Sequence, residues 1–338
     1  MLSELKRQIK EGSIHGAFVL YGEESYLRNF YLSEVKKLFM DALPEFNMHE
    51  LNARNMAAYD LGDAVESYPM MSGKKLVIVN NFTDDLLKEG ENEFSGLIEN
   101  LPEFTALFFV YDESVDPPVK SSKLKKFFEK AFMVEFKSAS PKDLENWVMR
   151  HFKANKRVIY TTEIEYLLLR CGTSMTALSH EIEKISNFAT SEKIEKKHID
   201  AVTVPTIESR VYSLTDEIVR GRAQNAYVEL HGLFETGFES VVVLAVISRL
   251  FSDLIETKAA IKKEGSADKA AKATGMAPWL MRKNAQIVRG FSHGQLLRAL
   301  SLCLKADVDI KSSRIDQKIV LEVLIASLID LKRERKNA

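Results

Sequence analysis

Five apolar runs of strand length lie within the first 137 residues, and their alternation with segments of helical spacing limits the fold more than any other feature. The runs cover residues 17–21, 48–51, 76–79, 105–111 and 132–136. The run at 76–79 is unbroken, which is typical of a strand that is buried on both faces. Strands that alternate with helices form a parallel sheet covered by helices. We therefore expect an α/β domain over residues 1–139.

The strand pattern stops at a Ser-Ala-Ser-Pro segment that begins at Ser138. Ser140 followed by Pro141 and Asp143 is a typical helix start, with a capping residue and a proline in the first turn. Apolar positions three and four residues apart then predict a small helical domain over 140–205 and an all-α domain over 206–338. The final helical segment, 316–332, is apolar around most of its circumference, which indicates a core helix or one shared with neighbouring subunits.

Charge and cysteine content exclude several classes of function. The formal net charge is -1, so the chain as a whole has no electrostatic attraction to nucleic acid. Cys171 and Cys303 lie far apart and the histidines form no metal-binding motif, so we expect neither a disulfide framework nor a metal site. The first residues lack an apolar signal core and no apolar run is long enough to cross a bilayer. These features predict a cytoplasmic protein without membrane contact.

The segment 60–82 joins a predicted helix to the apolar run at 76–79. Leu61, Ala64, Val65 and Tyr68 share one face of that helix and are expected to pack inward. Pro69 ends the helix, because the residue before a proline avoids the α region.

Met70 and Met71 follow Pro69 at the resulting corner, just before Ser72 and Gly73. Methionine is flexible and polarizable, so it suits a contact surface that adapts to a partner. Two interpretations remain open: the pair covers the core, or it binds another protein.

The turn after the first strand, 21–28, is where a nucleotide-binding α/β domain carries its phosphate loop. Gly22 is present, but the second glycine, the lysine and the Ser/Thr of that motif are missing, and Glu23 and Glu24 would repel a triphosphate. We therefore expect no productive ATP binding, no catalytic residue and no cofactor.

An apolar run that ends in Asp112-Glu113 matches a Walker B pattern. Without a phosphate loop, these carboxylates are expected to cap the strand end in water. The lysine-rich segment 120–130 is expected to be a solvated helix face, with contact to nucleic acid or an acidic partner as the alternative.

Residues 20–27, 68–79 and 309–311, in this order and spacing, resemble the delta subunit family of the bacterial DNA polymerase III clamp loader, and the resemblance covers essentially the whole chain. It implies an AAA+-like α/β domain with a degenerate P-loop, a helical lid domain and a C-terminal helical collar domain. The position equivalent to Walker B holds Asn80-Asn81, which cannot bind Mg²⁺ as carboxylates would.

The resemblance also implies a function. The chain would bind and help open the DNA sliding clamp during replication, without hydrolysing ATP, as part of a DNA-directed DNA polymerase holoenzyme, a transferase complex. Pro69, Met70 and Met71 would form the clamp contact, where many relatives carry aromatic residues. The collar would bind the ATPase tau/gamma subunits and delta prime, primed DNA would be contacted indirectly or weakly, and the protein would be associated with the nucleoid at replication forks.

Two other functions are open at this stage. The first is an active AAA+-like ATPase or DNA-processing enzyme that uses Asp112 and Glu113. The second is a helical adaptor that makes no clamp contact.

Overall fold

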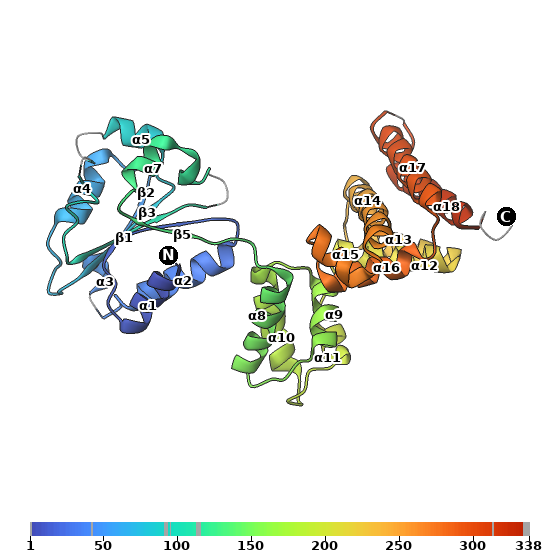
Figure 1. Ribbon diagram of the computed structural model, residues 1–338, viewed down its shortest axis with the longest axis horizontal. Coiled ribbons are helices and arrows are strands. Elements are labelled where there is room, and N and C mark those ends of the chain that lie inside the picture. The colour runs from blue at the N-terminus through green and yellow to red at the C-terminus, as the bar shows by residue number, and fades with distance from the viewer. Residues whose placement is uncertain are drawn as a thin grey trace. The chain divides into compact units, whose positions relative to one another are not determined.

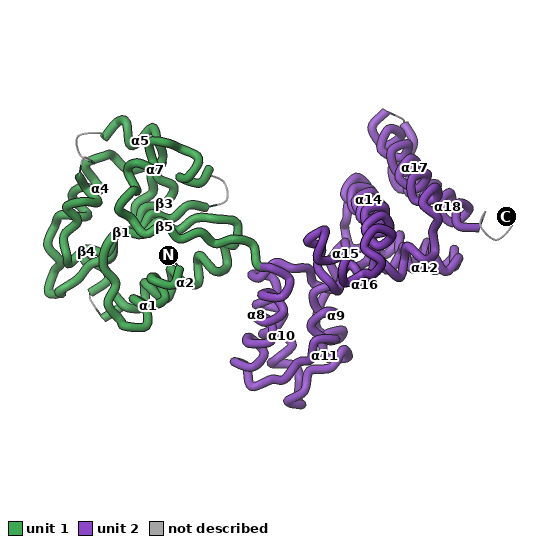
Figure 2. The backbone as a smooth tube through the Cα atoms, in the orientation of Figure 1, with its two compact units in different colours: residues 1–139 green, residues 140–338 purple. Residues whose placement is uncertain are grey.

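The computed structural model describes residues 2–41, 43–90, 94, 96–112, 116–312 and 314–333. The chain forms two compact units, residues 1–139 and residues 140–338, which Figure 2 shows in different colours. The further division of the second unit at residue 205 into lid and collar stays a prediction. Among the described residues, no helix is both long and apolar enough to cross a membrane.

The first unit is built on a five-stranded parallel sheet with the strand order β2-β3-β4-β1-β5. The strands are β1 (Gly16–Tyr21), β2 (Met48–Asn52), β3 (Lys75–Asn80), β4 (Thr105–Val110) and β5 (Phe132–Glu135). Each predicted apolar run forms one strand, so the predicted parallel α/β fold is confirmed.

Alternate residues of each strand pack on opposite faces of this sheet. Val19 belongs to the cluster covered by α4 (Ala58–Glu66), α5 (Asp84–Glu89) and α7 (Ser122–Phe127). Phe18 and Leu20 belong to the cluster covered by α1 (Leu2–Glu11) and α2 (Ser25–Lys37), on the other side of the sheet (Figure 1). The described residues of this unit also form two short helices, α3 (Pro44–Asn47) and η1 (Pro118–Lys120).

The second unit is helical. Its elements are α8 (Pro141–Ala154), α9 (Thr161–Cys171), α10 (Met175–Phe188), α11 (Lys196–Val202), α12 (Ile207–Arg220), α13 (Ala223–Glu235), α14 (Ser240–Glu264), α15 (Ala267–Thr274), α16 (Pro278–Val288), α17 (His293–Ser312) and α18 (Gln317–Arg333). The hydroxyl of Ser140 accepts a hydrogen bond from the amide of Asp143 at 3.2 Å, which is the predicted cap. The predicted all-α character of this part of the chain is confirmed.

The apolar surface of α17 and α18 is only partly used by the core of the second unit. Helix α18 buries Leu321, Ile325 and Leu328 against the neighbouring helices. It leaves Ile319 and Val323 exposed, and α17 likewise exposes a stripe formed by Leu297, Leu304 and Val308. These exposed apolar positions are spaced four or seven residues apart and so lie on one side of each helix.

Candidate functional site

Helix α4 buries its predicted apolar face, except for Tyr68, whose predicted inward position is wrong. The helix ends at Glu66, because Ser67 adopts an extended backbone with φ -57° and ψ 139°. Tyr68 therefore lies beyond the helix and is 86% exposed. Its ring packs against Phe104, with the ring centroids 5.1 Å apart. The helix thus ends one residue earlier than Pro69 alone predicts.

Met70 and Met71 lie outside the core, in the segment between α4 and β3 that we name the Met corner (residues 67–74). Met70 is 51% exposed and Met71 is 92% exposed. The interpretation that they cover the core is therefore wrong. Met71 also has a φ of 50°, in the left-handed region that costs a residue with a Cβ about 1–2 kcal/mol. A strained residue that projects its side chain into solvent requires the surrounding contacts to hold it there.

Asn47 provides one of these contacts. It is 1% exposed and meets the backbone of Met70 through both ends of its side-chain amide. The Met70 amide donates to Asn47 Oδ1 at 2.7 Å, and Asn47 Nδ2 donates to the Met70 carbonyl at 2.8 Å. The amide of Asn47 therefore fixes the Met corner at the residue just before Met71.

Lys75 holds the first residue of the Met corner, Ser67. It is 1% exposed, and its ammonium group donates to the carbonyl and, at 2.9 Å, to the hydroxyl of Ser67. Burial lowers the pKa of Lys75, while Asp63 opposes this shift. The amine also lies 5.7 Å from the ring centroid of Phe104. The Lys75 ammonium group at the C-terminal end of α4 thus binds a carbonyl oxygen that has no partner within the helix.

Sheet register explains why these residues meet. Met48 pairs with Leu76 in the parallel β2–β3 ladder, so Asn47 lies beside Lys75, next to the Met corner. Sequence reasoning missed both residues, because it had no strand register with which to place Asn47 beside Lys75. The only sequence signal for the role of Asn47 was the position of an asparagine immediately before a predicted strand.

The opposite edge of the sheet, at the carboxyl ends of the strands, holds the degenerate phosphate loop. Gly22 has a φ of 120°, and a Cβ there would lie 2.4 Å from the carbonyl oxygen of Phe136. The amide of Glu24 donates to that same oxygen at 2.9 Å, and Arg28 donates to the Gly22 carbonyl at 2.9 Å. These contacts bind the turn to the end of β5 and leave it tightly packed.

Asp112 is also held in place at this edge. Asn81 Nδ2 donates to Asp112 Oδ2 at 2.6 Å, and the Asp112 amide donates to Asn81 Oδ1 at 2.9 Å. Asp112 thus ties the end of β4 to the end of β3, as expected of a residue that caps a strand. Glu113 lies outside the described residues.

The pocket at this edge has a volume of about 510 Å³, and Glu23, Asp112 and Glu135 line it together with Lys120 and Lys137. Lys120 pairs with Asp116 at 2.6 Å, and Lys137 pairs with Glu135 at 3.4 Å. Both cations are therefore engaged with carboxylates. A site with three carboxylates and no unpaired lysine among its described lining residues is unfavourable for a triphosphate.

Comparison with known proteins identifies the family. A model described as "DNA polymerase III, delta subunit" matches residues 18–137, and one described as "DNA polymerase III delta subunit, C-terminal domain" matches residues 208–328. Together they cover more than two thirds of the 338 residues. The chain belongs to the DNA polymerase III delta subunit family.

Similar proteins include other delta subunits. The DNA polymerase III subunit delta of Bacillus subtilis is 23% identical over 354 residues, which cover 100% of this chain and 99% of that protein. A probable DNA polymerase III subunit delta of Aquifex aeolicus is 25% identical over 77% of this chain and 75% of its own length. The solved structure of the Bacillus subtilis DNA clamp loader delta protein has the same fold, with a TM-score of 0.62 at 21% identity, over 98% of this chain and 100% of that one.

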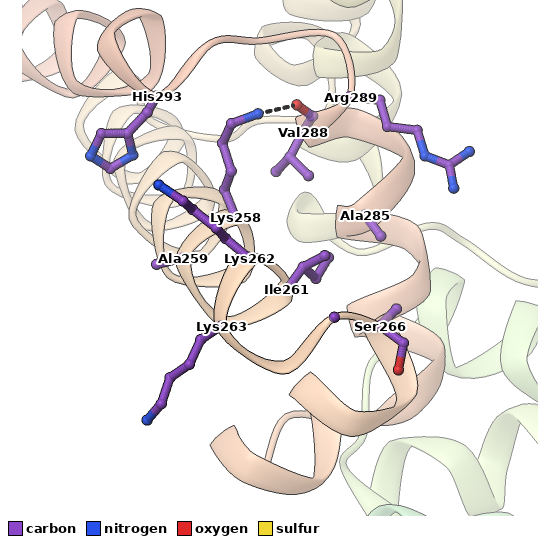
Figure 3. A pocket seen from close by; sticks show the side chains of 12 residues that line it. Lys258, Ala259, Ile261, Lys262, Lys263, Ser266, Ala285, Val288, Arg289 and His293 are labelled. Atoms are coloured by element: carbon purple, nitrogen blue, oxygen red, sulfur yellow. Dashed lines mark hydrogen bonds between the residues drawn. The ribbon is translucent and has the colours of Figure 1, made fainter.

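The second unit of this delta-family chain has a larger pocket, of about 1100 Å³, between α14, α15, α16 and the start of α17 (Figure 3). Lys258 donates to the carbonyls of Val288 at 3.0 Å and Phe291 at 2.7 Å, so it caps the end of α16. Figure 3 shows Lys263 and Arg289 pointing in different directions. The cationic groups do not converge on one point, and we assign no ligand to this pocket.

The packing around Gly22 gives a first prediction. We expect Gly22→Ala to lower the free energy of unfolding of the first unit by about 2–6 kcal/mol, because backbone strain and overpacking add. Gly12→Ala is the matched control, since Gly12 also has a positive φ, 69°, but a Cβ added there would have no atom within 4 Å. Urea denaturation measures both; equal losses for the two variants would contradict the close contact with Phe136.

Proposed function

We propose that this delta-family chain is the subunit of a replicative clamp loader that grips the sliding clamp, and that it does so through Pro69, Met70 and Met71. The observation that carries the proposal is the exposure of Met71, 92%, on a backbone that buried contacts hold in place. An apolar side chain that is fixed outside the core is the form expected of an anchor for a partner's pocket.

The chemistry of the Met corner suits an apolar pocket on the clamp. Burying one methionine side chain in such a pocket is worth about 1.5–3 kcal/mol. Because Lys75 already holds Ser67 and Asn47 already holds the backbone of Met70, binding would require little further ordering of the chain. The flexible, polarizable thioethers would adapt to the shape of such a pocket.

Ring opening follows if the Met corner binds the open clamp more tightly than the closed one, since a ligand shifts an equilibrium only by its differential affinity for the two states. The Met corner and the degenerate phosphate loop lie at opposite ends of the strands of one sheet. Clamp binding would not use ATP hydrolysis within this chain, whose turn at Gly22 lacks the phosphate lysine. The ATPase tau/gamma subunits and delta prime would control when the Met corner is available.

The helical collar would carry assembly with these subunits. The exposed stripe on α17 and the pair Ile319 and Val323 on α18 offer apolar surface for neighbouring subunits. Contact with primed DNA would be indirect or weak: within the lysine-rich segment, Lys120 pairs with Asp116 and Lys130 with Glu99. The protein would act in the cytoplasm, at replication forks.

A ring-opening assay tests the proposed function. A sliding clamp with a fluorescent pair placed across one subunit interface would be titrated with the purified chain, without ATP. We expect the fluorescence distance to increase with saturation. A chain that binds the clamp but leaves the distance unchanged is a passive tether, and the proposed opening role is then wrong. A chain that does not bind at all is the adaptor without clamp contact.

The alternative of an active ATPase or DNA-processing enzyme gives a second prediction. We expect the purified chain to show no ATP turnover and no useful ATP affinity, because the turn at Gly22 lacks the phosphate lysine and Asp112 is bound to Asn81. Phosphate release and nucleotide titration measure this. Steady turnover that disappears in Asp112→Asn would overturn the proposal that the chain does not hydrolyse ATP.

A further inference from the structure

We propose that Asn47 is a positioning residue for clamp binding: its side-chain amide holds the backbone of Met70 so that Met71 is presented in its binding conformation. This inference rests on the proposed function of the Met corner. Asn47 is the last residue of α3, 23 residues before Met70 in the sequence, and its side chain reaches the Met corner because of the β2–β3 register.

The two hydrogen bonds lie just beyond the amino-terminal end of the β2–β3 ladder and join Asn47 to Met70, within the Met corner. A side-chain amide has a donor and an acceptor on one planar group, so it pairs with a peptide N–H and C=O as a neighbouring strand would. An aspartate in this position could accept from the Met70 amide but could not donate to the Met70 carbonyl, and an alanine could do neither. The observed geometry, 2.7 Å and 2.8 Å, uses both functions of the amide.

Met71 makes this contact important for binding. Its left-handed backbone, with a φ of 50°, is disfavoured for methionine, and its side chain is almost wholly exposed, so core packing does not hold it. If the Met70 backbone is released, Met71 can relax to other conformations. The clamp then binds only the fraction of molecules in which the Met corner has the required conformation, which weakens the apparent affinity by that fraction.

The test compares Asn47→Ala, Asn47→Asp and a matched control, Gln8→Ala, for clamp affinity. Gln8 is also fully buried in the first unit and also uses both ends of its amide, toward Glu4 and His15, but it lies in α1. We expect Asn47→Ala to weaken clamp binding roughly 10-fold through the loss of two hydrogen bonds. Asn47→Asp should weaken clamp binding less than Asn47→Ala does. Gln8→Ala should lower the melting temperature about as much as Asn47→Ala but leave clamp affinity unchanged.

Two further measurements separate positioning from general destabilisation. Hydrogen exchange of the Met70 amide should be fast in Asn47→Ala and still slow in Asn47→Asp and Gln8→Ala. In a Met71→Ala background, Asn47→Ala should weaken binding much less than in the parent, because the side chain that it positions is gone.

Three results would overturn the inference: normal clamp affinity in Asn47→Ala, unchanged exchange of the Met70 amide, or equal losses of affinity in both backgrounds. These results are distinct from a failure of the proposed function. If Met70→Ala/Met71→Ala binds the clamp normally, the clamp contact itself is wrong. If that double variant fails to bind while Asn47→Ala binds normally, only the role of Asn47 is wrong.

Discussion

The double variant Met70→Ala/Met71→Ala should lose roughly 10²- to 10⁴-fold in affinity for the sliding clamp and still melt like the parent. Each side chain contributes about 1.5–3 kcal/mol when it is buried in a partner's pocket, but at 51% and 92% exposure neither contributes much to the core. Calorimetry or surface binding measures the affinity, and a thermal melt measures the stability. The variant should also still assemble with the other loader subunits.

Met149→Ala is the matched control for this variant. Met149 lies on α8 in the second unit and is about as exposed as Met70, so the substitution removes one methionine side chain from a surface outside the Met corner. It should leave clamp affinity unchanged. If the double variant instead lost the roughly 2–5 kcal/mol of stability per residue that is typical of a core position, the Met corner would be part of the core and the clamp contact would be wrong.

The second large effect is expected on assembly. Leu304→Glu/Val308→Glu places two charges on the exposed stripe of α17 and should abolish co-purification with the ATPase subunits and delta prime, a loss of roughly 10²-fold or more. A charge buried at an interface without a partner is costly. Because both residues are at least half exposed, the variant should fold, and it should bind the isolated clamp with the affinity of the parent.

Val204→Glu is the control for this prediction. Val204 is 70% exposed and lies between α11 and α12, outside both exposed apolar stripes. It should assemble normally. If Leu304→Glu/Val308→Glu also assembles at full strength, the stripe on α17 is not the collar surface, and residues 206–338 must use another face.

Regular elements of this chain could be predicted because their signals are local. An apolar run such as 76–79 needs only its own residues to indicate a buried strand, and Ser140 caps α8 through a contact three residues away. Helix α1 was not among the predicted elements, although Leu2, Leu5 and Ile9 are spaced three and four residues apart and pack against the core.

The shape of the Met corner could not be predicted, since it depends on contacts between distant residues. Tyr68 continues the helical spacing of α4, yet it lies outside the helix because Ser67 is extended and Lys75 binds the helix end. Asn47 reaches the Met corner only because β2 and β3 pair in a particular register. A left-handed backbone is usually signalled by a glycine, and Met71 gives no such signal. The sequence could thus indicate which residues form the corner, but not what holds them in place.

The measurement that tests the central claim most directly is a titration of the purified parent chain with the purified sliding clamp, without ATP or other loader subunits. We predict saturable binding that is weakened at least 100-fold by Met70→Ala/Met71→Ala and is unaffected by Met149→Ala. Absence of binding by the parent chain, or equal binding by the parent and the double variant, would contradict the account.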